Sequence, residues 1–185
     1  MMGNLWIFFI LGYGFIWIGM ILASKKRGKA IEDPETYRGR TIMQIIGLGM
    51  VPQVLPLFPA FFIRISSGAL FWSGFIIFMS GIFLDLISMF SFSKETEGLN
   101  TKGIYRWSRN PMYLGGFLFL LGLNIMGAAL SLANIFMFVL TLLWTGITHW
   151  HVLQEEKFLS KKYGDSYIAY LLQTPRYIGI LRRKK

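Results

Sequence analysis

The sequence predicts an all-α integral membrane protein with five transmembrane helices, in which helices 4 and 5 form a helical hairpin followed by a cytoplasmic C-terminal helical tail. Hydrophobic residues make up 54% of the 185 residues and charged residues only 15%, a balance typical of membrane proteins. The chain contains five apolar stretches long enough to cross about 30 Å of hydrocarbon. Nearly all lysines and arginines fall in segments that a five-span topology places on one side.

The five expected spans follow one another with short connections. The first lacks a basic start and a small-residue cleavage site, so we expect a retained helix rather than a signal peptide. Prolines 52, 56 and 59 should kink or break the second span, because they remove backbone hydrogen bonds. A tight turn is expected over residues 64–68. The spans are residues 4–23, 41–62, 69–92, 112–130 and 131–150.

Basic residues set the predicted orientation. With the N-terminus outside, the first loop, the third loop and the tail carry six, four and eight of the 19 lysines and arginines, which leaves only Arg64 on the other side. This asymmetry agrees with the positive-inside rule. We therefore expect one structural domain, made of helices 1–3 (residues 1–92) and a C-terminal half (residues 93–185) that meets the cytoplasm. The net charge of +10 favours membrane lipids with anionic headgroups over nucleic acid as partners.

Composition also excludes several chemistries. The sequence has no cysteine, which rules out disulfides, thiolate metal sites and a thiol nucleophile. His149 and His151 are the only histidines, too few for a di-iron site. His151 and Glu155 lie one helical turn apart but supply only two ligands, so no metal is expected. The lone Gly-Leu-Gly at residues 47–49 suits helix packing better than a nucleotide loop.

A polar segment over residues 103–115 separates the third and fourth spans. Asn110-Pro111 predicts a helix start, because Asn caps unpaired N–H groups and Pro suits the first helical position. Arg106 and Arg109 would then lie beside the positive end of that helix and could cradle a carboxylate or phosphate. The alternative is an ordinary turn at the membrane interface, with Arg, Trp and Tyr as anchors.

Three acidic residues are candidates for a site. Glu155 and Glu156 differ by about 100° around a helix, so one can face a pocket while the other forms a salt bridge or is solvated. The alternative is pairing with nearby lysines on the same helix. That helix should continue through residues 151–162 and end at Gly164 in a left-handed cap. Asp85 lies inside the third span and needs a partner there, either as a functional acid or as a structural hydrogen-bond acceptor.

Two stretches together resemble a known family. They are Gly103-Ile104-Tyr105 with Ser108-Arg109-Asn110-Pro111-Met112-Tyr113, and, about forty residues later, Glu155-Glu156 with the close from Tyr163-Gly164 to Tyr170. The combination resembles the isoprenylcysteine carboxyl methyltransferases and the related phospholipid N-methyltransferases. The likeness covers about residues 95–178. Asn110 stands where that family usually has His, and His151 stands where some members carry an Arg.

The resemblance implies that S-adenosylmethionine binds in a cytoplasm-facing pocket formed by the last two helices and the tail. Arg109 suits the cofactor's carboxylate, a glutamate suits its cationic groups, and a tyrosine ring suits its adenine. Glu155, Glu156 and Asn110 are the expected catalytic residues, and Asp85 and His151 are expected to bind the substrate. The expected cofactor-binding residues are Gly103, Tyr105, Arg109, Asn110, Pro111, Tyr113, Glu155 and Glu156.

The leading hypothesis is therefore an S-adenosylmethionine-dependent methyltransferase acting on a lipid or a lipophilic small molecule. One alternative is an NADPH-dependent enzyme similar to sterol reductases, which share an Arg-His/Asn-Pro-x-Tyr segment. The Glu155-Glu156 pair favours a cationic cofactor over NADPH. The other alternative is a non-catalytic membrane scaffold or transporter subunit that uses Asp85 and the proline-rich second span.

Overall fold

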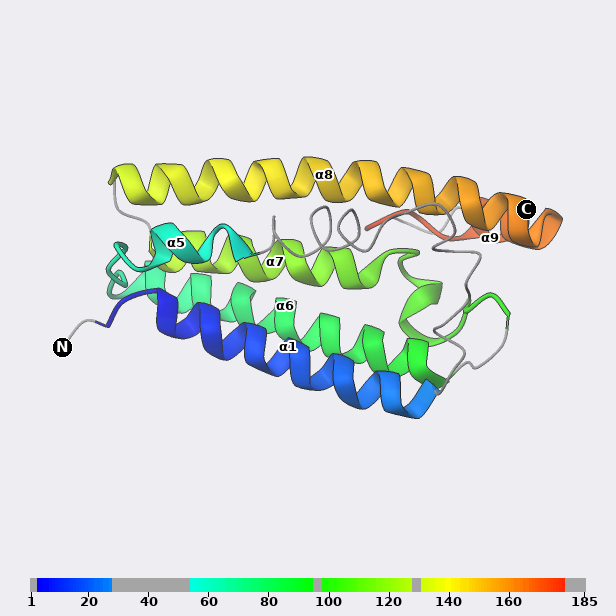
Figure 1. Cartoon of the computed structure of the whole chain (residues 1–185), viewed down its shortest axis with the longest axis horizontal. Helices are drawn as coiled ribbons and strands as arrows, with labels where there is room; N and C mark the ends of the chain where they lie inside the picture. The colour runs from blue at the N-terminus through cyan, green and yellow to red at the C-terminus, as the bar shows by residue number, and fades with distance from the viewer. Residues whose placement is uncertain (1–2, 28–53, 95–97, 128–130, 179–185) are drawn as a thin grey trace.

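A computed structural model describes residues 3–27, 54–94, 98–127 and 131–178, and these residues are helical with short connections (Figure 1). Among the described residues, four long helices lie side by side, with η2 (Gly103–Arg106) and α9 (Asp165–Gln173) at one end of the bundle and α5 (Leu57–Ala60) at the other (Figure 1). The all-α prediction is confirmed. The elements are α1 (Trp6–Arg27), α5 (Leu57–Ala60), α6 (Ala69–Lys94), η2 (Gly103–Arg106), α7 (Pro111–Met126), α8 (Leu132–Tyr163) and α9 (Asp165–Gln173).

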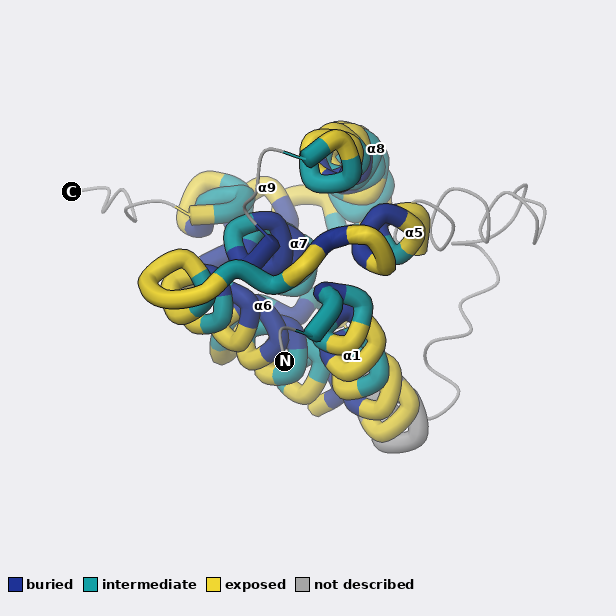
Figure 2. The backbone as a smooth tube through the Cα atoms, turned by 90° about the vertical axis from the view of Figure 1, so that its left-hand side faces the viewer, coloured by how far each residue is buried: buried dark blue, intermediate teal, exposed yellow. Residues whose placement is uncertain are grey.

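Two of these helices, α6 and α8, are long and apolar enough to cross a membrane, with 26 and 32 residues. α1 and α7 contribute shorter apolar stretches, Trp6–Gly19 and Pro111–Met126. Exposed residues run along α1, α6 and α8, whereas every residue of α7 is buried or half-buried (Figure 2). Many of the exposed residues on α1, α6 and α8 are large and apolar. An apolar exterior around a packed bundle is the arrangement that a bilayer stabilises. The protein is therefore a membrane protein with α7 at its centre.

Glycines allow α6 and α7 to approach closely. Gly74 and Gly81 on α6 face Gly122 and Gly115 on α7, and each pair within a helix is spaced by seven residues. A methyl group added at Gly74 would lie 2.8 Å from the Gly122 carbonyl oxygen, and one at Gly81 would lie 2.7 Å from the Gly115 carbonyl oxygen. Small residues at such positions let backbones pack directly, and this contact stabilises helix pairs in lipid.

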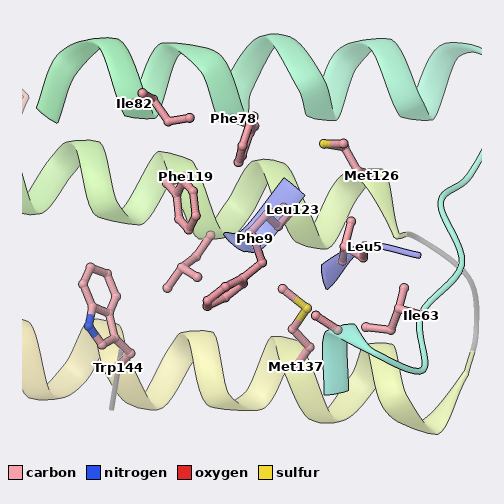
Figure 3. Close-up of a cluster of buried hydrophobic side chains, with 12 residues drawn as sticks. Leu5, Phe9, Ile63, Phe78, Ile82, Phe119, Leu123, Met126, Met137 and Trp144 are labelled. Atoms are coloured by element: carbon pink, nitrogen blue, oxygen red, sulfur yellow. The ribbon is translucent and has the colours of Figure 1, made fainter. Parts of the chain in front are cut away.

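The remaining core joins α1 and α8 to this pair (Figure 3). The Phe119 ring of α7 is 1% exposed and packs against Phe9 of α1 and Phe78 of α6, at centroid distances of 5.9 and 5.1 Å. Between α7 and α8, the buried Asn124 amide donates to Thr141 Oγ1 over 2.9 Å. In a bilayer no hydrophobic driving force brings helices together, so interhelical hydrogen bonds of this kind add to the stabilisation from packing.

One connection differs from the sequence prediction, and another lies partly outside the described residues. Of the predicted second span, residues 41–53 lie outside the described part of the chain. At its described end, which contains Pro56 and Pro59, the chain forms only one short helical turn, α5, preceded by Pro56. Residues 64–68 were predicted to form a tight turn, and this is wrong. Residues 63–65 are extended and pair with residues 3–5, because Leu5 N donates to the Ile63 carbonyl and Ile65 N donates to the Gly3 carbonyl.

Helix ends at the other connections follow local sequence signals. α7 begins at Pro111, as predicted. α8 begins after Ser131, whose hydroxyl accepts from Asn134 N, and it continues past Trp150 to Tyr163, as predicted. Gly164 ends it with φ 54° and ψ −130°. The positive φ was expected, but this ψ lies outside the left-handed helical region, in a conformation that is essentially restricted to glycine. The turn directs α9 back along the end of the bundle.

Candidate active site

The polar segment before α7 and the C-terminal segment (residues 165–178) are joined at one end of the bundle. Ser108 Oγ and Asn110 Nδ2 both donate to the Arg176 carbonyl, each over 3.2 Å. Arg109 N donates to the Pro175 carbonyl over 3.0 Å, and the buried Tyr170 hydroxyl donates to the Tyr105 carbonyl over 2.7 Å. These bonds connect residues more than 60 positions apart in the sequence, so this end of the protein is built from both segments.

Asn110 occupies the position before α7, but its side chain does not cap the helix. The predicted side-chain cap is therefore wrong. The physical reason is competition, because the Asn110 amide instead donates to the Arg176 carbonyl. Pro111 is the first helical residue, so the loss of the cap leaves the helix start intact.

Glu156 is the charged centre of the site. Its carboxylate accepts from Arg176 Nε at 3.0 Å and Arg176 Nη2 at 2.7 Å, and it also pairs with Arg109 Nη2 at 3.2 Å. The side chains of Glu156 and Arg109 are only 12% and 10% exposed. Two-point binding by a guanidinium is the stronger form of this interaction. Glu156 therefore fastens the C-terminal segment to α8 and to the segment before α7.

Glu155 has a different environment. It lies on the exposed side of α8, and its carboxylate Oε2 accepts from the Tyr113 hydroxyl of α7 over 3.2 Å. The two adjacent glutamates thus face different partners, as the 100° separation predicts. The alternative of pairing with lysines on α8 is not seen in the contacts described for either carboxylate, which run to Tyr113, Arg109 and Arg176. Glu155 is the carboxylate that no arginine neutralises.

The other predicted site residues lie around this centre. Gly103 and Tyr105 are in η2, and the buried Tyr105 packs near Phe92 at the end of α6. Arg106 is exposed, whereas Arg109 turns inward to Glu156, so the two arginines do not form the predicted joint cradle. Arg109 nevertheless has a buried Nε without a hydrogen-bond partner in the described structure. One donor of Arg109 is therefore left for a ligand.

Asp85 and His151 are not brought to Glu155 by the contacts described. Asp85 is buried on α6 next to Gly115, where an added methyl would lie 3.1 Å from its carboxyl carbon. Gly115 faces α6, while Tyr113, about 200° away around α7, faces α8. His151 is half-buried on α8, and its ring lies edge-on to Trp150. Their predicted roles in substrate binding remain predictions.

The sequence analysis assigned no site role to three contributors to this region, Arg176, Tyr177 and His149. Arg176 is the only basic residue between Lys162 and Arg182, and this isolation was a usable signal for a specific role. Tyr177 follows it, and its hydroxyl lies 3.0 Å from His149 Nδ1 on α8. Nothing in local spacing indicates that contact, because the two residues are 28 positions apart.

The surroundings of the C-terminal segment raise the pKa values of one arginine and two tyrosines in it. The hydrogen bonds to Glu156 raise the pKa of the Arg176 guanidinium. Burial, assisted by the Glu156 charge, raises the pKa of Tyr167 to about 12, and burial also raises the pKa of Tyr170. At neutral pH the arginine is therefore charged and both phenols are protonated, so Tyr170 is able to donate to the Tyr105 carbonyl.

Comparison with known proteins places this chain in a family. The family model for phospholipid methyltransferases matches residues 63–166, a stretch from the end of α5 to the start of α9 that includes α6, η2, α7 and α8. The chain belongs to the phospholipid methyltransferase family. The suspected relationship to this group of membrane methyltransferases is thereby confirmed. No curated protein and no solved structure matches the chain.

The range matched by the phospholipid methyltransferase family model contains part of the candidate site. It includes Arg109, Tyr113, Glu155 and Glu156, and it ends before the C-terminal segment that carries Arg176. The partner of Glu156 on that segment thus lies outside the family match. Among the described residues, no group of three or more His, Asp or Glu could hold a metal ion.

Proposed function

We propose that this protein transfers a methyl group from S-adenosylmethionine to the headgroup amine of a phospholipid. The observation that carries the proposal is the convergence of Arg109 and Tyr113 with Glu155 and Glu156 at one end of α7 and α8. Family membership supports methyl transfer and suggests a phospholipid acceptor. Within such a lipid, the headgroup nitrogen is the atom with a lone pair suited to accepting a methyl group.

The donor set fits this cofactor. Arg109 keeps a buried Nε donor without a partner, which suits the cofactor's carboxylate. Glu155, which no arginine neutralises, suits its ammonium and sulfonium groups, and the Tyr113 ring offers a surface for the adenine or the cation. The sulfonium supplies an activated methyl group, so the protein's main task is alignment of acceptor and donor. Gly103, Tyr105 and Pro111 would shape the same pocket.

The roles of Glu156 and Asn110 follow from their bonds. Glu156 binds two arginines and Asn110 binds the Arg176 carbonyl, so both act as positioning residues that hold the C-terminal segment beside the proposed cofactor site. This assignment differs from a role in proton transfer. Both carboxylate oxygens of Glu156 are already engaged by guanidinium groups, so neither is placed to take a proton from a substrate.

The charge balance favours this cofactor over NADPH. Arg109 and Arg176 both pair with Glu156, and Glu155 lies nearby beside Tyr113. The two positive charges are thus balanced by two carboxylates, and little net positive charge remains for the phosphate groups of NADPH. We further propose five transmembrane helices, with the N-terminus outside and the site at the cytoplasmic membrane surface. The asymmetry of basic residues supports this orientation. A lipid acceptor would then reach the site from the bilayer, and the cofactor from the cytosol.

Calorimetric titration of the detergent-purified full chain with S-adenosylhomocysteine, and separately with NADPH, tests the proposal. We expect only S-adenosylhomocysteine to bind. Glu155→Gln should weaken that binding about tenfold, which corresponds to about 1.4 kcal/mol. Lys157→Gln, an exposed change on the same helix, is the matched control and should bind normally. Glu156 and Arg109 variants are less suitable, because they also release the C-terminal segment.

The companion assay measures transfer of radiolabelled methyl groups to phosphatidylethanolamine in nanodiscs. Labelled lipid from the wild type would support the proposal, and binding of NADPH in place of S-adenosylhomocysteine would contradict it. Binding of neither ligand by folded protein would favour a non-catalytic role. The side of the membrane on which the site lies is checked separately. Single cysteines are introduced into the C-terminal tail of the protein, and their labelling by a membrane-impermeant reagent is compared in intact cells and in vesicles.

A further inference from the structure

His149 and Tyr177 form a pair that the site described so far does not use. The His149 Nδ1 atom lies 3.0 Å from the Tyr177 hydroxyl oxygen, and the ring centroids are 6.0 Å apart. His149 is exposed on α8, and Tyr177 is half-buried in the C-terminal segment. An imidazole that is both accessible and hydrogen-bonded at one nitrogen keeps its second nitrogen, Nε2, available for a ligand.

The position of Tyr177 is set by its neighbour. The Arg176 carbonyl accepts from Ser108 and Asn110, and the Arg176 guanidinium binds Glu156. Tyr177 is therefore held against α8 by bonds on the preceding residue. When Nδ1–H donates to the Tyr177 oxygen, the lone pair lies on Nε2, which is the tautomer required of a proton acceptor.

The pair lies between the charged centre and the apolar part of α8. His149 precedes Glu156 by seven residues, so the two share a face of α8 about 10 Å apart along the helix axis. Before His149, α8 carries the exposed apolar residues Leu142 and Leu143. A lipid whose chains lie against this apolar part would place its headgroup at the level of His149.

We propose that His149, oriented by Tyr177, removes a proton from the headgroup ammonium of the acceptor lipid. This inference rests on the proposed function and names the group that makes the amine nucleophilic. The N–H bond of the ammonium breaks and a new N–H bond forms at His149 Nε2. The freed lone pair on the amine then accepts the methyl group as the carbon–sulfur bond of the donor breaks, and the imidazolium returns its proton to water.

The other titratable groups near the pair are already engaged. Tyr177 and Arg176 come from the C-terminal segment, Glu156 lies on the same face of α8, and Tyr113 and Glu155 form the neighbouring contact between α7 and α8. Glu156 binds two arginines, and Glu155 is assigned to the cationic cofactor. Among the groups named here, His149 keeps a ring nitrogen, Nε2, for which the described part of the chain shows no hydrogen bond.

The first test is the pH dependence of methyl transfer to phosphatidylethanolamine in nanodiscs by His149→Gln. At pH 7 we expect its turnover to fall about 100-fold, within the usual range for loss of a general base, with S-adenosylhomocysteine affinity unchanged. The deficit should shrink towards pH 10, because a primary amine with a pKa of about 10 then loses its proton to water. Tyr177→Phe should show a smaller deficit with the same trend, and Lys157→Gln should show none.

The second test needs no methyl donor. With labelled histidine, the His149 ring signals, assigned by their loss in His149→Gln, should shift when phosphatidylethanolamine is added to phosphatidylcholine nanodiscs. Phosphatidylcholine alone serves as the control, because its headgroup nitrogen carries no hydrogen to donate. The inference predicts a shift specific to the primary amine, and the absence of such a shift would count against it.

The outcomes separate the two proposals. If the wild type methylates phosphatidylethanolamine and His149→Gln is as active as wild type, or is impaired equally at all pH values, the role of His149 is overturned and the proposed function stands. If the wild type binds S-adenosylhomocysteine but methylates no amine lipid, the acceptor assignment and the role of His149 both fail, while cofactor binding stands. If the wild type binds no S-adenosylhomocysteine, the proposed function itself fails.

Discussion

Replacing Glu156 with glutamine should destabilise the protein more than any other single charge change in the site. The substitution keeps the side-chain volume and removes the charge that pairs with Arg109 and Arg176. Arg109 is 10% exposed and would keep a buried charge without its partner. Breaking a buried ion pair in this way costs about 3–5 kcal/mol. Because Arg176 is 36% exposed and remains partly solvated, we expect a loss of about 3 kcal/mol.

The two neighbouring variants provide an internal scale. Arg176→Gln leaves Glu156 paired with Arg109 and should cost about 1–2 kcal/mol, the value of hydrogen bonds to a charged group. Glu155→Gln alters one exposed contact with the Tyr113 hydroxyl and should cost less than about 1 kcal/mol. Stability is measured by the loss of helical circular dichroism as SDS is titrated into detergent-solubilised protein.

A double-mutant cycle gives the sharper measurement. Glu156 and Arg176 share two hydrogen bonds. The loss of stability in the double variant Glu156→Gln/Arg176→Gln should therefore be smaller than the sum of the two single losses, by about 1 kcal/mol or more. Additive losses, or a larger loss for Glu155→Gln than for Glu156→Gln, would refute the reasoning that Glu156 fastens the C-terminal segment.

Two further predictions concern glycines. Gly122→Ala would place its methyl group against the Phe78 backbone at the contact between α6 and α7, so we expect a loss of about 1–3 kcal/mol from overpacking; Gly146→Ala on α8, where no atom lies within 4 Å of the added methyl, should be neutral or slightly stabilising in the same SDS titration. Gly164→Ala should cost about 1–3 kcal/mol, because φ 54° with ψ −130° is strained for alanine; equal stability to Gly146→Ala would show that the turn relaxes.

Local chemistry explains which features were predictable. Pro111 begins α7 because its fixed φ suits the first helical turn, and Gly164 ends α8 because other residues avoid its backbone conformation. The long apolar runs required helices, since a backbone in hydrocarbon must satisfy its own hydrogen bonds. The separation of Glu155 from Glu156 also follows from helix geometry alone.

Predictions failed where a distant segment competed with the local one. Asn110 is a residue type that commonly caps helices, but its side-chain amide donates to the Arg176 carbonyl instead. Residues 64–68 were predicted to form a tight turn, but residues 63–65 are extended and pair with the start of the chain at residues 3–5. In both cases the hydrogen-bond partner found in the structure is about 60 residues away in the sequence. Sequence patterns that span one or two helical turns cannot predict such a contact.

The apolar helices described here, the segment before α7 and the separation of the glutamate pair were predictable, because each depends on residues within a few positions of one another. The binding of Glu156 to Arg109 and Arg176, the contact of Glu155 with Tyr113 and that of Tyr177 with His149 were not predictable from local sequence. These contacts depend on how helices cross and where the C-terminal segment returns, and those positions are set by packing such as the glycine contact between α6 and α7.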